Sequence, residues 1–160
     1  MLLTTVLIAD FEKAGRATCQ RLLQPEKKIK VVGEARCGLE AMTAAAKLKP
    51  CVLLLDPSGV EGEGVSLVST ILEKSPKTRI ILLGERASDA DILDAISQGA
   101  LGYLAKPALP SYLTKAVRAV AAGEAWVPRR MVGRLIDQLA PGQAEGAREL
   151  GPRWHRRTSN

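Results

Sequence analysis

The chain has 160 residues, 46% hydrophobic and 25% charged, a composition typical of a globular domain and not of a disordered segment. Lysine and arginine number 23 against 17 acidic residues, a formal net charge of +6. Only 3% of residues are aromatic, too few for the stacking platforms that bind single-stranded nucleic acid. The apolar runs at 52–55 and 80–83 are far shorter than the roughly 20 residues of a membrane span. Because the N-terminus also lacks a basic signal segment, we predict a soluble, cytoplasmic protein.

The cysteine and histidine counts exclude several kinds of site. Cys19, Cys37 and Cys51 are odd in number and widely spaced, so they form neither a fully paired disulfide framework nor a Cys-x-x-Cys zinc motif. We expect all three to be small buried thiols. The one histidine, His155, lies among arginines near the C-terminus, and no histidine metal cluster or catalytic triad can be assembled from it. We also predict that the chain is not an enzyme.

The basic charge is concentrated near the C-terminus. Residues 1–126 carry 16 basic and 14 acidic side chains, whereas residues 127–160 carry seven arginines and three acidic side chains. The body of the chain is thus nearly neutral. A solvated linker explains the basic segment better than a nucleic-acid contact does, because its net charge of four is spread over 34 residues.

The first 126 residues alternate strand-like and helix-like segments. Short β-branched or continuously apolar runs predict five strands, at 5–9, 29–32, 51–55, 79–83 and 102–104. Each run precedes a helical pattern, and the fourth helix begins with the capping box of Ser88 and Asp91. We expect Ser111 to cap the fifth helix, and Gly99 and Gly123 to end the last two. Five such units predict an α/β fold, a doubly wound five-stranded parallel sheet.

The C-terminal quarter predicts one further helix and a tail. Pro128 stands at the start of a pattern in which Met131, Leu135 and Leu139 share one face. The chain then becomes rich in glycine, proline and arginine. We therefore divide it into a domain at 1–126, an amphipathic helix at 127–140 and a flexible basic linker at 141–160.

Polar residues follow four of the predicted strands. Asp10 follows the first strand, Asp56 the third, Gly84 and Glu85 the fourth, and Lys106 the fifth. Ligands of open parallel sheets bind at this carboxyl edge. Two neighbouring carboxylates repel each other unless a cation joins them, for which Mg²⁺ is a natural choice, and a lysine can neutralise a transferred anion. The pattern favours phosphoryl transfer onto an aspartate.

At these residues the chain resembles the response regulator receiver domains, over residues 4–126 and in the manner of the LuxR/NarL type. The segments that carry the resemblance are 6–10, 31–35, 52–56, 99–107 and 116–124. The resemblance implies a flavodoxin-like receiver fold. It also implies that Asp56 is the phosphoacceptor, which receives phosphate from a histidine kinase with Mg²⁺ present.

The resemblance assigns roles to several other residues. Lys106 is the charge partner of the phosphate, and the peptide bond to Pro107 is usually cis. Tyr103 takes the place of the switch aromatic on the fifth strand, although packing alone would explain it equally well. The implied metal ligands are Asp10, Asp56 and the backbone carbonyl of Ser58.

Two departures from the family pattern affect this pocket. The family normally has two consecutive acids after the first strand, whereas here Asp10 is followed by Phe11, and Glu12 reaches the metal only if the turn is rearranged. Gly84 stands where the family keeps a threonine or serine, whose hydroxyl binds the phosphoryl group, and Glu85 adds like charge. We predict a weak or absent Mg²⁺ site and little or no phosphorylation.

Three alternatives compete with a receiver that controls an output domain. A nucleotide-binding enzyme is suggested by Gly59, Gly62 and Gly64, but the Walker lysine is missing and Glu61 and Glu63 would repel phosphate. A flavin carrier shares the topology, but the loop after the first strand has too few serines, threonines and glycines for FMN. The third is a phosphorylation-independent pseudo-receiver that acts as a stand-alone protein-interaction module.

Family behaviour also suggests partners. Residues 157–160 resemble the start of a helix-turn-helix domain, so we expect the chain to be a piece cut just ahead of its DNA-binding half. DNA would be contacted only through that output domain, because these residues contain no recognition helix. A homodimer is expected through 89–98, 102–104 and 111–122, and no membrane partner is expected.

Overall fold

The computed structural model describes residues 3–59, 67–85 and 88–139. Within them, five strands form one parallel sheet in the order β2-β1-β3-β4-β5. The strands are β1 (Thr4–Ala9), β2 (Ile29–Ala35), β3 (Val52–Leu55), β4 (Arg79–Gly84) and β5 (Gly102–Ala105). The predicted parallel five-stranded α/β fold is confirmed, and the strand order reverses between β1 and β3.

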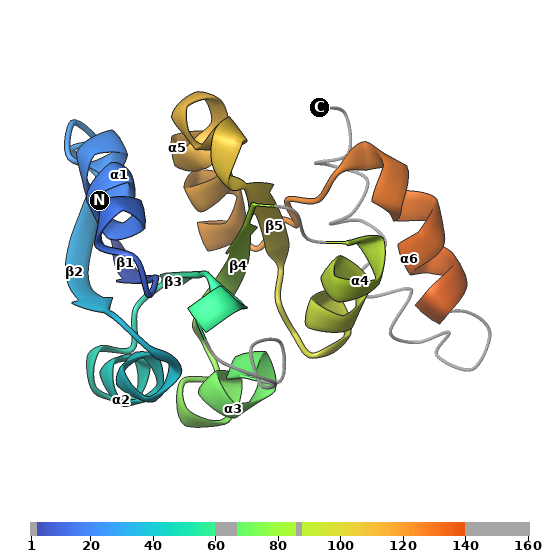
Figure 1. Cartoon of the computed structure of the whole chain (residues 1–160), viewed down its shortest axis with the longest axis horizontal. Coiled ribbons are helices and arrows are strands. Elements are labelled where there is room, and N and C mark those ends of the chain that lie inside the picture. The colour runs from blue at the N-terminus through green and yellow to red at the C-terminus, as the bar shows by residue number, and fades with distance from the viewer. Residues whose placement is uncertain (1–2, 60–66, 86–87, 140–160) are drawn as a thin grey trace.

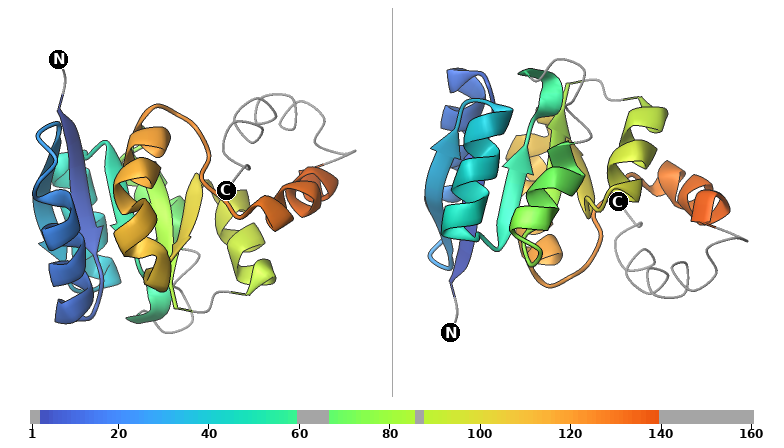
Figure 2. Two further views of the ribbon diagram at one scale, coloured as in Figure 1. Left: turned by 90° about the horizontal axis from the view of Figure 1, so that it is seen from above. Right: turned by 90° about the horizontal axis from the view of Figure 1, so that it is seen from below.

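Helices cover both faces of the sheet (Figure 1 and Figure 2). Helices α1 and α5 lie on one face, and α2, α3 and α4 lie on the other. The helices are α1 (Lys13–Leu23), α2 (Gly38–Leu48), α3 (Leu67–Lys74), α4 (Asp89–Ser97), α5 (Leu109–Ala121) and α6 (Val132–Leu139). Because both faces are covered, the central strands are apolar on both sides, and Val6, Leu7 and Ile8 have no exposed surface.

The predicted helix ends are partly right. The Ser88 hydroxyl accepts a hydrogen bond from the Asp91 N–H at 3.1 Å, as the capping box predicts. Gly99 and Gly123 end their helices with φ of +118° and +89°, a conformation that favours glycine. The prediction that Ser111 caps α5 is wrong. The helix begins at Leu109, directly after a 3₁₀ turn, with a proline in its first turn.

The prediction that all three cysteines are buried is wrong for two of them. Cys19 lies on the inner face of α1 and is 1% exposed. Cys37 and Cys51 are exposed. Cys37 is the N-cap residue of α2 and Cys51 immediately precedes β3, so both lie at the ends of elements and outside the core.

The segment after α5 returns to the sheet. The Trp126 N–H donates to the Leu101 carbonyl at 3.1 Å, and the Trp126 carbonyl accepts from the Tyr103 N–H at 2.8 Å. Residue 126 thereby covers part of the free edge of β5. The chain then enters a 3₁₀ turn, Arg129–Met131, and α6, which lies beside α4 in Figures 1 and 2.

Apolar and charged contacts hold α6 and the 3₁₀ turn before it against the rest of the domain. Met131 is fully buried and Leu135 is 3% exposed, and both belong to the main core. Arg130 and Arg134 each donate to one carboxylate oxygen of Asp89 in the first turn of α4, at 3.1 and 2.7 Å. The division of the chain at residue 126 stays a prediction, and the predicted linker at 141–160 lies outside the described residues.

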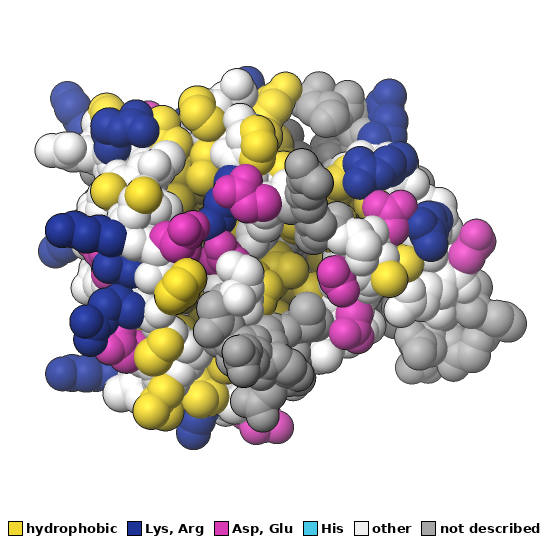
Figure 3. Space-filling view, in the orientation of Figure 1, with side chains coloured by type: hydrophobic (Ala, Val, Ile, Leu, Met, Phe, Trp, Pro, Cys, Tyr) yellow, Lys and Arg dark blue, Asp and Glu magenta, His cyan; other side chains and the backbone are white. Residues whose placement is uncertain are grey.

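Lysine and arginine side chains gather along the left edge of Figure 3, on the side of the molecule that β2 and α1 form. Lys27, Lys28 and Lys30, which lead into and belong to β2, are all exposed. Among the described residues, none of the helices has both the length and the apolar character needed to cross a bilayer.

Candidate functional site

The site lies where the strand order reverses. Asp10 and Asp56 follow the neighbouring strands β1 and β3, and the Asp56 N–H donates to the Ala9 carbonyl at 2.9 Å. The Asp10 N–H donates to the Ala35 carbonyl at 3.0 Å, which continues the pairing of β1 with β2. These backbone bonds hold the two carboxyl residues side by side at the edge where open sheets bind ligands.

Lys106 joins the two carboxylates. Its Nζ lies 2.9 Å from Asp10 Oδ2 and 2.5 Å from Asp56 Oδ2. The side chains of Lys106, Asp10 and Asp56 are 11%, 1% and 5% exposed, so all three charges are largely removed from water. A buried carboxylate is costly unless it is paired, and here one ammonium pairs with two. The structure therefore brings together three of the residues that the sequence placed at this edge.

Backbone N–H groups bind the remaining carboxylate oxygens. The Glu12 N–H donates to Asp10 Oδ1 at 2.9 Å, and the Ser58 N–H donates to Asp56 Oδ1 at 2.8 Å. Each of the four oxygens thus accepts at least one hydrogen bond. The short turns after β1 and β3 supply these donors, because each N–H lies two residues after its acceptor.

The contacts perturb the pKa values of the pocket. Burial acts to raise the pKa of Asp56, but hydrogen bonds from Lys106 and Ser58 outweigh it and hold the pKa below its ordinary value. Burial acts to lower the pKa of Lys106, but hydrogen bonds to Asp56 and Asp10 outweigh it and raise the pKa above its ordinary value. At neutral pH the pair is therefore carboxylate and ammonium.

Arg16 supports the turn that carries Asp10. Its Nη1 donates to the Asp10 carbonyl at 2.7 Å, and its Nε donates to Glu34 Oε1 on β2 at 3.1 Å. Gln20, one turn later on α1, donates to the other oxygen of Glu34 at 2.9 Å. Sequence reasoning missed this support, because an arginine and a glutamate 18 residues apart give no pattern that connects them.

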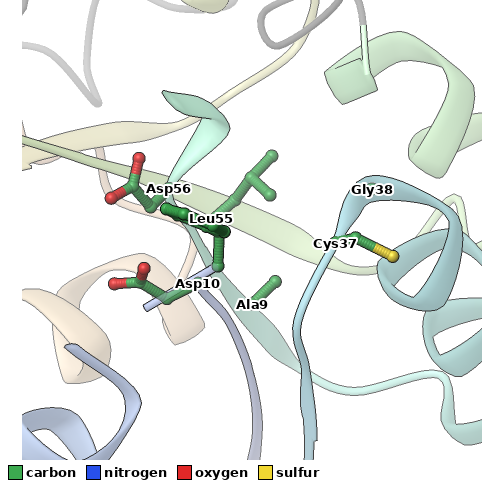
Figure 4. A pocket seen from close by; sticks show the side chains of 7 residues that line it. Ala9, Asp10, Cys37, Gly38, Leu55 and Asp56 are labelled. Carbon is green, nitrogen blue, oxygen red and sulfur yellow. The ribbon is translucent and has the colours of Figure 1, made fainter. Parts of the chain in front are cut away.

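Phe11 and Glu12 do not add a carboxylate to the pocket. Phe11 is 61% exposed, and the exposed Glu12 occupies the N-cap position of α1. Phe11 also lines a cavity of about 10 Å³, room for about one water molecule, together with Asp10, Asp56 and Cys37. Figure 4 shows the two aspartates turning their carboxylates to the same side, away from the Cys37 sulfur.

The side-chain oxygens that a divalent ion would meet at this edge are those of Asp10 and Asp56. Both Oδ2 atoms bind the Lys106 ammonium, which lies between the carboxylates and would repel a second cation. Among residues 3–59, 67–85 and 88–139, no group of three or more histidine, cysteine, aspartate or glutamate side chains could hold a metal. The backbone carbonyl of Ser58 as a metal ligand stays a prediction.

Tyr103 on β5 and Gly84 on β4 lie on neighbouring strands and contact each other. The Tyr103 side chain is 7% exposed, and its hydroxyl donates to the Gly84 carbonyl at 3.3 Å. Gly84 is the last residue of β4, and the exposed Glu85 follows it.

The expected cis bond before Pro107 is wrong, because the described peptide bonds are all trans. A 3₁₀ turn, Lys106–Ala108, accommodates the proline in the intrinsically preferred trans form.

The glycine loop that suggested nucleotide binding falls largely outside the described residues, since 60–66 are not described. The pocket itself contains buried carboxylates where a nucleotide site would present N–H donors to phosphate. The geometry of the described residues is thus that of a small, acidic, lysine-paired pocket.

Comparison with known proteins assigns the family. The model of the response regulator receiver domain matches residues 6–118. DevR/DosR, a DNA-binding transcriptional activator of Mycobacterium tuberculosis, is 34% identical over 140 residues, which cover 88% of this chain and 64% of the relative. NarL, the nitrate/nitrite response regulator of Escherichia coli K12, is 30% identical over 146 residues, which cover 91% and 68%. The chain thus spans about two thirds of the length of these relatives.

Solved structures agree with the sequence comparison. The isolated receiver domain of RcsB from Salmonella enterica serovar Typhimurium, in its apo form, is 27% identical with a TM-score of 0.74 over 84% of this chain and 98% of that one. The non-phosphorylated receiver domain of RcsB from Escherichia coli is 26% identical with a TM-score of 0.72 over 79% and 98%. Such domains are in general signalling modules and not enzymes. The chain belongs to the response regulator receiver family, as a receiver domain of the NarL type.

Proposed function

We propose that Asp56 is the phosphoacceptor and Lys106 its charge partner. In this step an Asp56 carboxylate oxygen attacks the phosphorus of a kinase phosphohistidine. The P–O bond forms as the P–N bond breaks, and the histidine nitrogen keeps the electron pair and takes up a proton. The 2.5 Å contact between Lys106 and Asp56 supports this role, because the ammonium already lies where the negative charge of the phosphoryl group would develop.

We further propose that phosphorylation of this receiver is slow, because its Mg²⁺ site is weak or absent. The observation that carries this proposal is that Lys106 bridges Asp10 and Asp56 while Phe11, in place of a second acid, is exposed. Any divalent ion would compete with the lysine for two carboxylates and gain no third. Gly84 in turn offers no side-chain hydroxyl to the phosphoryl oxygens.

Phosphorylation by acetyl phosphate tests both proposals. The native chain is compared with Phe11→Asp/Gly84→Thr, which restores the second acid and the hydroxyl, at several Mg²⁺ concentrations. We expect the restored variant to incorporate phosphate at least roughly tenfold faster than the native chain, with saturation at lower Mg²⁺. Phosphate-affinity electrophoresis measures the rate.

Asp56→Asn is the control for the acceptor. If Asp56→Asn still accepts phosphate at the rate of the native chain, Asp56 is not the acceptor. If the native chain is labelled as fast as the restored variant and with the same Mg²⁺ dependence, the proposal of a weak site is wrong. The two outcomes are independent, since one concerns which residue reacts and the other how fast.

We propose a homodimer through the surface of 89–98, 102–104 and 111–122. Tyr112, on α5, is 36% exposed, whereas Asp89 at the start of α4 is already bound by Arg130 and Arg134 of the same chain. We therefore expect the α5 part of this surface to make the contact. Sedimentation velocity of Tyr112→Ala should show weaker association, and Leu39→Ala on α2 should not. Equal association of both variants with the native chain contradicts this surface.

We infer that the whole protein is a cytoplasmic transcription regulator, with a histidine kinase as partner and residues 141–160 as the linker to a DNA-binding domain. The names of DevR/DosR and NarL support this inference, and both are longer than this chain. A stand-alone interaction module has less support, because these relatives are regulators. Reading the gene beyond Asn160 decides between the two.

A further inference from the structure

Gly15 lies in the first turn of α1, and its missing side chain leaves the space in which the Asp10 carboxylate lies. A Cβ atom built on Gly15 would stand 2.0 Å from Asp10 Oδ2 and 2.7 Å from Asp10 Cγ. Real Cβ atoms essentially never approach another heavy atom within 3.0 Å. Any other residue at position 15 would therefore displace this carboxylate.

Any movement of the Asp10 carboxylate would cost free energy, because it would break hydrogen bonds in a buried site. The Asp10 side chain is 1% exposed, and both of its oxygens are bound, Oδ2 by Lys106 at 2.9 Å and Oδ1 by the Glu12 N–H at 2.9 Å. The buried Cys19 lies one turn further along the same side of α1. A shift of Asp10 would thus break contacts to a buried charge, which costs more than an ordinary surface adjustment.

The backbone gives no other reason for glycine at this position. Gly15 has no positive φ, and among the described residues only Gly99 and Gly123 combine glycine with that conformation. Inside a helix, alanine is more favourable than glycine by about 1 kcal/mol. Helix propensity alone would therefore favour alanine at position 15, and the contact with Asp10 opposes it.

We propose that Gly15 is a positioning residue of the pocket: because it has no side chain, the Asp10 carboxylate has room beside α1 and stays on Lys106. Asp10 then serves as a fixed counter-ion of the lysine. The inference rests on the proposed function in that it concerns the same pocket. Its test measures unfolding and not phosphorylation, so each can fail without the other.

Thermal unfolding of Gly15→Ala tests the proposal against a matched control. Gly133 lies in α6, and a Cβ built there meets nothing within 4 Å. Gly133→Ala should raise Tm by about 2–4 °C through helix propensity alone. Gly15→Ala should instead lower Tm, by roughly 4–8 °C, because Asp10 loses its partners.

Removal of the Asp10 carboxylate should turn the fall in Tm caused by Gly15→Ala into a rise. In an Asp10→Ala background the obstruction is gone, and Gly15→Ala should raise Tm by about the same 2–4 °C as Gly133→Ala. This comparison decides the matter even if the single variant Gly15→Ala does not fold. A fall in Tm in the Asp10→Ala background overturns the proposal, because the cost would then not depend on Asp10.

The NMR signal of the Glu12 amide reports on the position of the Asp10 carboxylate. In the native chain this N–H donates to Asp10 Oδ1, and in Gly15→Ala its proton signal should shift upfield because that bond is lost. In Gly133→Ala it should stay in place. An unshifted Glu12 amide together with a raised Tm in Gly15→Ala shows that position 15 does not hold Asp10.

Discussion

Lys106 and Asp56 approach within 2.5 Å at the carboxyl edge of the sheet, and each alters the ionisation of the other. The same ammonium also binds Asp10, so one lysine neutralises part of the charge of two buried carboxylates. The stability of the fold and the chemistry of the pocket therefore depend on one contact. This coupling leads to the following predictions.

Replacing Lys106 by methionine should destabilise the protein strongly. Methionine retains most of the side-chain volume but leaves Asp10 and Asp56 buried without their cation. Breaking a buried ion pair costs about 3–5 kcal/mol, and we expect a loss in this range by urea unfolding at pH 7. Lys106→Met/Asp56→Asn should recover part of the loss. Additive losses in the double variant would show that the contact carries no coupling.

The stability should fall in acid because of Asp56. Its pKa is lower in the folded protein than in the unfolded chain, so its contribution is complete above the unfolded value and is lost as the pH falls through the folded one. We therefore expect the urea midpoint to decline below about pH 4. Asp56→Asn should be less stable than the native chain at pH 7, and the gap should narrow in acid. A constant gap contradicts the prediction.

Lys106 should give the opposite behaviour in alkali. Its pKa is raised on folding, so its contribution is complete below the ordinary lysine value and is lost as the pH rises through the folded one. Between about pH 5 and 9 both contributions are complete, and we expect a plateau of stability across this range. The assignment is contradicted if the stability of the native chain changes steadily with pH between about pH 5 and 9 and that of Lys106→Met does not.

The three thiols should react in two classes. Burial, together with the nearby Asp10 carboxylate, raises the pKa of Cys19 to about 12, whereas Cys37 and Cys51 are exposed. Two thiols should react promptly with Ellman's reagent in the native protein, and the third only after urea is added. Cys37→Ser/Cys51→Ser should remove the fast phase. A fast phase of three thiols would mean that the inner face of α1, which carries Cys19, is accessible to the reagent.

Apolar packing should hold α6 more firmly than its ion pairs do. Met131 is fully buried, and Met131→Ala should cost about 2–5 kcal/mol by urea unfolding. The side chain of Arg134 is 56% exposed, and Arg134→Ala should cost less than about 1 kcal/mol. Equal losses would show that the contact to Asp89 contributes as much as the core does, and would contradict the prediction.

Most of the fold follows from local pattern. Four-residue apolar runs such as Val52–Leu55 indicate strands buried on both faces, and Gly99 and Gly123 end helices in the φ range that glycine favours. Asp10, Asp56 and Lys106 could be placed at one edge for the same reason, since parallel strands end together. Local pattern failed at Cys37 and Cys51, because burial of a small residue depends on neighbours distant in the sequence.

The sequence alone determined the strand and helix order, the family resemblance, and the missing acid and hydroxyl at Phe11 and Gly84. Only the tertiary structure decided how the remaining charges are paired. Lys106 binds both aspartates, and Gly15 leaves the space that one of them fills. Two of the arginines that the sequence assigned to the basic C-terminal quarter bind Asp89 on α4. The sequence determines how many charged residues there are. The tertiary structure determines which of them form ion pairs, because electrostatic attraction in water is strong only at short range.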